Sequence, residues 1–88
     1  MIITVTGAII QEGNKYLIGR RGPDEKSPGL WEFPGGKLEE GETREECIKR
    51  ELKEELCIDA DIGELYSEYL FKYPHISYKL YFYIVNSF

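Results

Sequence analysis

The chain has 88 residues, a formal net charge of −5 and two cysteines. This length allows one domain with a modest core and excludes two independent domains. An acidic chain is poorly suited to following a nucleic-acid polymer or an anionic membrane surface, because both would repel it. No apolar run approaches the roughly 20 residues needed to cross a bilayer. We therefore expect a single domain over residues 1–88 that binds neither nucleic-acid polymers nor membranes.

The first part of the chain predicts a β-hairpin followed by a loop. Residues 1–10 are apolar and β-branched around Gly7, which predicts a buried strand. A turn around Gly13 follows, and residues 15–21 alternate well enough to predict the returning strand. Residues 22–29 contain two prolines and two glycines, which is typical of a surface loop.

A short apolar segment then leads into a glycine pair. Residues 30–34 predict a short strand with Trp31 and Phe33 on one side and Glu32 on the other. A bare glycine pair, here at positions 35–36, is most often a turn. Because an acidic helix follows, we expect this pair to bring the backbone close to a phosphate or a metal ion without a Cβ in the way.

The most strongly patterned element is an acidic helix that begins after Thr43. Thr43 and Glu46 form the T-x-x-E pattern, in which each side chain satisfies a backbone N–H of the first turn. At about 100° per residue, three apolar side chains fall on one narrow arc, which predicts the buried edge of the helix. These are Ile48, Leu52 and Leu56. Three carboxylates border that edge: Glu51, Glu54 and Glu55.

Two interpretations of these carboxylates are open on helix chemistry alone. Carboxylates beside a core lose solvation and repel one another, so a cation is expected between them, and oxygen-only ligands suit Mg²⁺ or Mn²⁺. The alternative is a solvated helix stabilised by the i,i+4 pairs Glu45–Lys49 and Glu46–Arg50.

The last third of the chain predicts two strands joined by a turn. Residues 65–71 and 76–86 have strand character, with Pro74 and His75 in the turn between them. Both faces of the second strand are apolar, which predicts that both are covered. His75 is the only histidine, and we expect a polar surface residue rather than a catalytic base.

The spacing of residues 36–58 closely resembles the signature box of the Nudix hydrolase family. The pattern reads G-x5-E-x7-R-E-L-x-E-E-x-C-I, and a match of this length and fixed spacing is specific. The preceding LWEFPGGK, residues 30–37, is similar to the MutT-type branch, which hydrolyses nucleoside triphosphates such as 8-oxo-dGTP. One position departs from the family, which has glycine where this chain has Cys57. Either the helix continues past Cys57, or this residue accepts a left-handed backbone at about 1–2 kcal/mol.

This resemblance implies both a fold and a reaction. The fold is α/β (α+β), a mixed β-sheet sandwich that holds the Nudix helix. The reaction is the Mg²⁺-dependent attack of water on a nucleoside triphosphate, which gives a nucleoside monophosphate and pyrophosphate. Alternative substrates are ADP-ribose, to which Pro74 gives weak support, and other nucleotide conjugates. A metal- or nucleotide-binding module with little turnover is the alternative from a different class.

The resemblance also implies the residues of the site. It assigns metal binding to Glu51, Glu54 and Glu55, with a backbone oxygen near Gly36. It counts Arg50 among the catalytic residues, and it gives Arg50 and Glu42 the task of bracing the carboxylates. Glu51 or Glu55 could instead act as the base, a choice left open. On the substrate side it places Arg21, for which Arg20 could substitute, together with Phe33, Gly35, Gly36 and Lys37.

The chain ends where the family continues, so we expect the C-terminal part of the fold to be missing. That part carries a further metal-binding glutamate and base-reading residues. An incomplete sandwich exposes apolar sheet surface, which predicts either a fragment of a longer protein or self-association over the open sheet face. Cys47 and Cys57 lie about 15 Å apart by helical rise, too far for a disulfide. Two free thiols and the lack of a leader predict a cytoplasmic protein.

Overall fold

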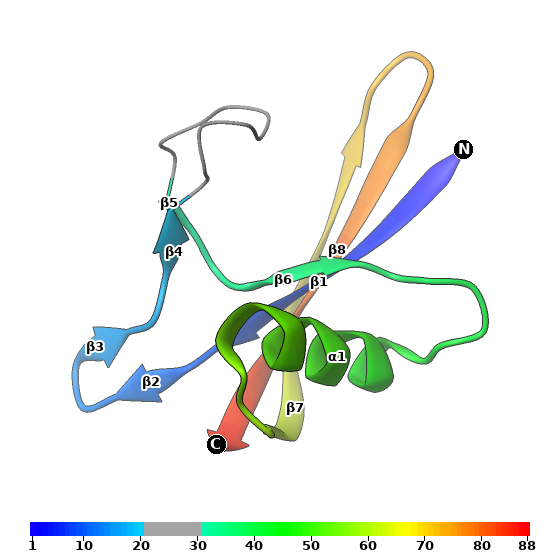
Figure 1. Ribbon diagram of the computed structural model, residues 1–88. Coiled ribbons are helices and arrows are strands. Elements are labelled where there is room, and N and C mark those ends of the chain that lie inside the picture. Colours follow the sequence, from blue (N-terminus) through cyan, green and yellow to red (C-terminus); the bar gives the residue numbers. More distant parts are fainter. Residues whose placement is uncertain (21–30) are drawn as a thin grey trace.

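The computed structural model describes residues 1–20 and 31–88, so Arg21 and the loop at 22–29 lie outside the described residues. Within this part, one helix packs against one side of a four-stranded mixed sheet, as Figure 1 shows. The strand order in this sheet is β6-β1-β8-β7. The elements are β1 (Ile2–Ile9), β2 (Gln11–Glu12), β3 (Lys15–Tyr16), β4 (Gly19–Arg20), β5 (Trp31–Glu32), β6 (Gly35–Lys37), α1 (Arg44–Leu56), β7 (Asp61–Lys72) and β8 (Ser77–Ser87). The expected mixed α+β architecture is confirmed.

β1 is a central strand and not the first arm of a hairpin. It pairs antiparallel with β6 and parallel with β8, so that Thr6 is opposite Gly36 on one side and Tyr81 on the other. The predicted hairpin is therefore confirmed only around its turn at Gly13, where β2 pairs with β3 and the Leu17 N–H donates to the Ile10 carbonyl oxygen, whereas β1 itself pairs with β6 and β8. Both edges of β1 are occupied, and the returning segment divides into β3, which pairs with β2, and β4, which pairs with β5.

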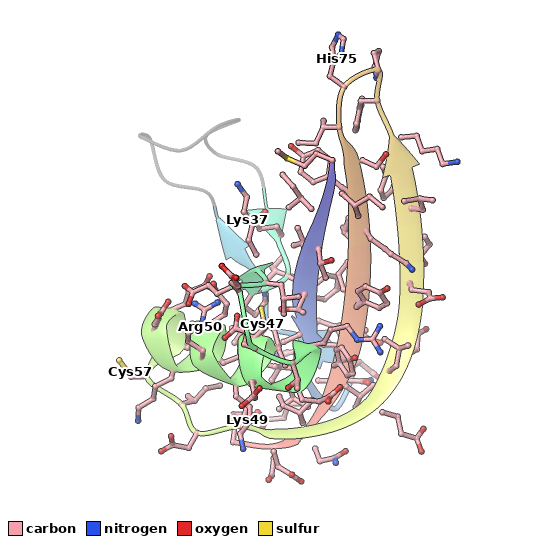
Figure 2. The ribbon with its side chains drawn as sticks, turned by 90° about the vertical axis from the view of Figure 1, so that its right-hand side faces the viewer. Lys37, Cys47, Lys49, Arg50, Cys57 and His75 are labelled. Atoms are coloured by element: carbon pink, nitrogen blue, oxygen red, sulfur yellow. The ribbon has the colours of Figure 1, made fainter. Side chains whose placement is uncertain are left out.

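β7 and β8 form a long antiparallel hairpin with His75 exposed at its tip (Figure 2). Both strands were predicted, but β7 begins at Asp61 rather than at position 65. Its register against β8 shifts between Asp61 and Ser67. Such irregularities break the period-two pattern on which a sequence prediction of a strand depends.

α1 begins and ends at defined caps. The side chain of Thr43 accepts the N–H of Glu46 at 3.1 Å, and the carboxylate of Glu46 accepts the N–H of Thr43 at 2.8 Å. The predicted capping box is confirmed. At the other end Cys57 has φ 57° and ψ 32°, and its N–H donates to the Lys53 carbonyl at 3.0 Å. Of the two alternatives, the second is confirmed: the helix stops at Cys57, and this residue adopts a left-handed backbone conformation.

The core lies between α1 and the sheet. Its buried members are Ala8, Ile10, Ile48, Leu52, Ala60 and Val85. Leu56, predicted on the same arc as Ile48 and Leu52, is instead 37% exposed. It lies in the last turn of the helix, next to the cap that redirects the chain.

The sheet is covered well on one face. Tyr81, Tyr83 and Val85 are buried on the side of α1, and the Arg44 guanidinium lies 4.0 Å from the Tyr81 ring centroid. The intervening residues of β8 lie on the opposite face, where Phe82 is half-buried and Ile84 exposed. In Figure 2 the helix lies on one side of the sheet, and no described helix lies on the other. Full cover of both faces was expected, and the described residues do not provide it.

Among the described residues, 1–20 and 31–88, no helix has both the length and the apolar character needed to cross a membrane.

Candidate active site

The third turn of α1 meets β6 at Gly36. The Glu51 carboxylate occupies the space beside this glycine, and a Cβ added to Gly36 would collide with it. Glu51 is half-buried by this contact. Only glycine therefore lets this carboxylate approach the strand so closely.

Gly35 has a different reason to be glycine. Its φ of 154° is rarely adopted by other residues, and a Cβ here would collide with the carbonyl oxygen of Thr6. Its N–H group donates to the Glu55 carboxyl group. The glycine pair thus forms part of a strand rather than a turn, and its backbone faces the acidic edge of α1.

The Gly36 carbonyl oxygen is already engaged within the protein. It accepts the Thr6 hydroxyl at 3.4 Å, and the Cys47 thiol lies 3.7 Å away. The sequence led us to expect this backbone position to offer an oxygen to a metal ion. That metal contact of a backbone oxygen near Gly36 stays a prediction, and the geometry gives Gly36 a further role, since it makes room for Glu51.

Arg50 ties the acidic residues together. Its guanidinium donates to Glu42 at 2.8 and 3.0 Å, to Glu51 at 2.9 Å and to Glu54 at 3.3 Å. It also donates to the Lys37 carbonyl at 3.1 Å, which links α1 to β6. The hydrogen bonds from Arg50 lower the pKa of Glu42 to about 2. This arrangement matches the bracing task expected of Arg50 and Glu42, and Glu46 is engaged with the cap instead of with Arg50.

Glu51 and Glu55 lie one turn apart with their carboxyl groups in contact. Although Glu55 is exposed as a whole residue, desolvation of its carboxyl group, followed by the hydrogen bond with Glu51 and its charge, raises the Glu55 pKa to about 7. Two carboxyl groups this close hold a shared proton or a cation more readily than two negative charges. The pair offers only oxygen donors, which suits a hard divalent ion.

Glu54 is placed differently from the other two glutamates. Its side chain is 59% exposed and is turned toward Arg50. Across residues 1–20 and 31–88, no three carboxylate, thiol or imidazole groups are already gathered as a metal site. The residues present fit a divalent ion through the Glu51–Glu55 pair, with Glu54 within reach along the same helix.

A cleft of about 690 Å³ opens beside these groups. Its lining includes the polar residues Thr6, Glu32, Lys37, Glu55 and Tyr78, together with the glycines Gly35 and Gly36. Glu32 is the residue that sequence reasoning missed, and its charge contributes to the raised pKa of Glu55. The alternation of Trp31, Glu32 and Phe33 predicts that Glu32 lies on the opposite side of the strand from the two aromatic residues. It does not predict which part of the protein that side faces.

Phe33 lines the apolar end of the same cleft. Its ring makes edge-to-face contacts with Tyr16 and Phe82, at centroid distances of 6.4 and 6.0 Å. The side chains of Arg20 and Arg21 lie outside the described residues. Figure 2 places His75 at the tip of the β7–β8 hairpin, far from Arg50, in line with its expected surface position.

The arrangement is that of a known family. The model of the NUDIX domain matches residues 1–87, so this chain belongs to the Nudix family. Its relatives are of the MutT type. It is 44% identical to an 8-oxo-dGTP diphosphatase of Haemophilus influenzae over 87 residues, which cover 97% of this chain and 63% of that enzyme.

Two further comparisons agree on the family but differ in name. A CTP pyrophosphohydrolase of Escherichia coli is 44% identical over 63 residues, which cover 72% of this chain and 47% of the relative. The solution structure of the E. coli ORF135 protein superposes with a TM-score of 0.86 at 35% identity, covering 98% of this chain and 61% of that one. The chain therefore spans about three-fifths of the length of the relatives it matches along its whole length. Nudix hydrolases act on small nucleotide substrates and generally use a divalent metal ion.

Proposed function

We propose that this protein hydrolyses a nucleoside triphosphate to a nucleoside monophosphate and pyrophosphate in the cleft beside β6. One observation carries the proposal: the Glu51 carboxylate is seated against Gly36, with the carboxyl group of Glu55 in contact with it. Water supplies the oxygen that forms the new bond to phosphorus. The P–O bond between the monophosphate and pyrophosphate parts breaks, and pyrophosphate leaves. Glu51 or Glu55 accepts the proton of the attacking water.

Mg²⁺, or Mn²⁺ in its place, is the proposed cofactor. Glu51 and Glu55 would hold it, and Glu54 would join them from its exposed position on the same helix. The ion would neutralise charge on the phosphates and polarise their oxygens. Arg50 and Glu42 keep the carboxylates oriented through the hydrogen bonds described above.

The substrate side of the proposal rests on the cleft lining. The Lys37 ammonium group offers a positive charge at the phosphate end, and Gly35 and Gly36 allow close approach of the backbone. Phe33 offers a ring face or edge to the base. Arg21 is proposed as a further base contact on the strength of its position in the MutT-type pattern.

Oxidised guanine nucleotides are the first substrates to test, because the Haemophilus relative is named an 8-oxo-dGTP diphosphatase. CTP is the second, after the E. coli relative, and ADP-ribose represents nucleotide conjugates. A binding module with little turnover is the competing function.

A substrate panel with separate detection of pyrophosphate and phosphate tests these alternatives. We expect pyrophosphate release that requires Mg²⁺ and stops with EDTA. Calorimetric titration with Mn²⁺ runs beside it, since metal binding without hydrolysis of any nucleotide in the panel would favour the binding module.

Replacing Glu54 by Gln tests the site assignment. The change removes the charge of one proposed metal ligand without changing the shape of the side chain, so we expect activity to fall at least about 100-fold with the fold intact. Glu12→Gln, which removes an exposed carboxylate from β2, is the matched control and should keep full activity. Near-normal turnover in Glu54→Gln would refute the assignment.

We also propose that a second copy of the chain covers the sheet face opposite α1. Two shallow cavities, of about 420 and 550 Å³, lie on this face. Apart from Phe33, which also lines the substrate cleft, six side chains that line them are 36–66% exposed, and we call them the open face: Tyr16, Tyr66, Tyr69, Phe71, Tyr73 and Ile84. At about 200 Å² for each large side chain, the open face amounts to roughly 600 Å², enough for one side of an interface at the smaller end of the standard range.

A further inference from the structure

Two buried side chains lie directly behind the glycine strand β6, namely Thr6 of β1 and Cys47 of α1. Thr6 is 1% exposed and Cys47 is fully buried. The Thr6 hydroxyl lies 3.2 Å from the Cys47 thiol and donates to the Gly36 carbonyl oxygen at 3.4 Å. The thiol is 3.7 Å from the same oxygen. Three elements, β1, β6 and α1, therefore meet at one carbonyl group.

Side-chain packing cannot hold β6 against α1 at its two glycines, because they have no side chains to interdigitate. On the solvent side, Arg50 links α1 to β6 through its hydrogen bond to the Lys37 carbonyl. On the buried side, the contacts of Thr6 and Cys47 with the Gly36 carbonyl oxygen link β1 and α1 to β6. A buried hydroxyl is costly without hydrogen-bond partners, and valine would fill the same volume. The hydroxyl at position 6 is thus explained by the two partners it has.

We propose that Thr6 and Cys47 are positioning residues that clamp β6 to α1 and thereby fix the seat of the Glu51 carboxylate. Cys47 and Glu51 are four residues apart on the same side of the helix. Both meet Gly36, Cys47 at its carbonyl oxygen and Glu51 where a Cβ would be. Figure 2 shows Cys47 between the helix and the sheet. If β6 moved slightly away from α1, the contacts of both Cys47 and Glu51 with Gly36 would lengthen. The clamp therefore fixes the position of the Glu51 carboxylate.

The clamp itself is tested without metal, by amide hydrogen exchange. Thr6→Val removes the hydroxyl and keeps the shape, whereas Thr6→Ser keeps the hydroxyl and is the matched control. We expect Thr6→Val to speed exchange at Gly36 and at Leu38, whose N–H donates to the Thr4 carbonyl oxygen, relative to Leu80 of β8, and Thr6→Ser to leave that ratio near the wild-type value. Cys47→Ala, which removes the other half of the clamp, should act in the same direction. Equal protection of β6 in all four proteins would overturn the clamp.

The effect on the site is tested by calorimetric titration with Mn²⁺, and this part rests on the proposed function. We expect Thr6→Val to weaken Mn²⁺ binding about tenfold, as loss of an outer-shell partner commonly does, and Thr6→Ser to restore it. Unchanged Mn²⁺ affinity in a Thr6→Val protein whose β6 amides exchange faster would overturn the positioning role. If the wild-type chain bound no Mn²⁺, the proposed metal site would fail, and exchange would still decide the clamp.

Discussion

At the scale of single residues, glycine and arginine decide how the carboxylates are arranged. Gly36 provides the room for Glu51, and the Arg50 guanidinium holds Glu42, Glu51 and Glu54 around one positive charge. The motif spacing identifies these residues as a set. It contains no information on which of them touch, because contact depends on the distance between α1 and β6.

The Glu42–Arg50 pair makes stability depend on pH in a predictable direction. The folded protein holds the pKa of Glu42 at about 2, below its ordinary 4.5. A lowered folded pKa means that the pair stabilises the protein fully above pH 4.5. The contribution is then lost as the pH falls from there toward about 2. Glu42→Gln should therefore be less stable than the wild type at neutral pH, and the difference should vanish in strong acid.

Urea unfolding at a series of pH values measures this difference. Glu40→Gln removes an exposed carboxylate from the same turn and controls for a change of net charge. A gap between wild type and Glu42→Gln that stayed constant down to pH 2 would contradict the assignment.

At the scale of elements, α1 is governed by its two ends. The capping box at Thr43 sets where the helix begins, and the left-handed Cys57 sets where it stops. The stop matters for the site because Glu51, Glu54 and Glu55 all lie in the last two turns. The family's glycine at position 57 would adopt this conformation without a steric penalty.

Replacing Cys57 by Gly should stabilise the protein. Relief of the left-handed strain is worth about 1–2 kcal/mol, and the greater flexibility of glycine in the unfolded chain offsets about 0.4–1 kcal/mol of it. We expect a net gain below about 1.5 kcal/mol by urea unfolding. Cys57→Ala is the control, since it removes the thiol and keeps the Cβ, and it should bring no such gain. Equal stabilisation by both variants would assign the effect to the thiol instead.

At the scale of the whole molecule, the sheet presents one covered and one open side. The side facing α1 is buried, whereas the open face exposes six large side chains. β7 is also one of the two edge strands of the four-stranded sheet, and an exposed edge next to apolar surface favours association.

Self-association through the open face is measured by light scattering at several concentrations. We expect a mass that rises toward twice that of the chain, with Tyr69→Lys shifting the equilibrium to the monomer. Leu17→Lys changes a residue that is also exposed, at 42%, and lies outside the open face, so it should behave as the wild type. A folded chain that remains monomeric throughout would rule out the second copy as the cover.

The sequence by itself determined the acidic helix, its cap at Thr43, the β7–β8 strands and the family. Each of these depends on residues within a turn or two of one another, or on a fixed spacing along the chain. The left-handed stop at Cys57 was one of two stated outcomes, since sequence shows that a residue has a Cβ but not whether the surrounding fold tolerates the strain.

Only the tertiary structure decided the partners of β1, the engagement of the Gly36 carbonyl oxygen, the place of Glu32 in the cleft and the meeting of Thr6 with Cys47. These features join segments up to 75 residues apart along the chain, as in the pairing of Ile2 with Ser77. Such contacts are fixed by which strand edges pair and by how closely α1 approaches β6. The local pattern of a strand or helix shows which side is apolar, but the packing of distant elements decides what that side touches.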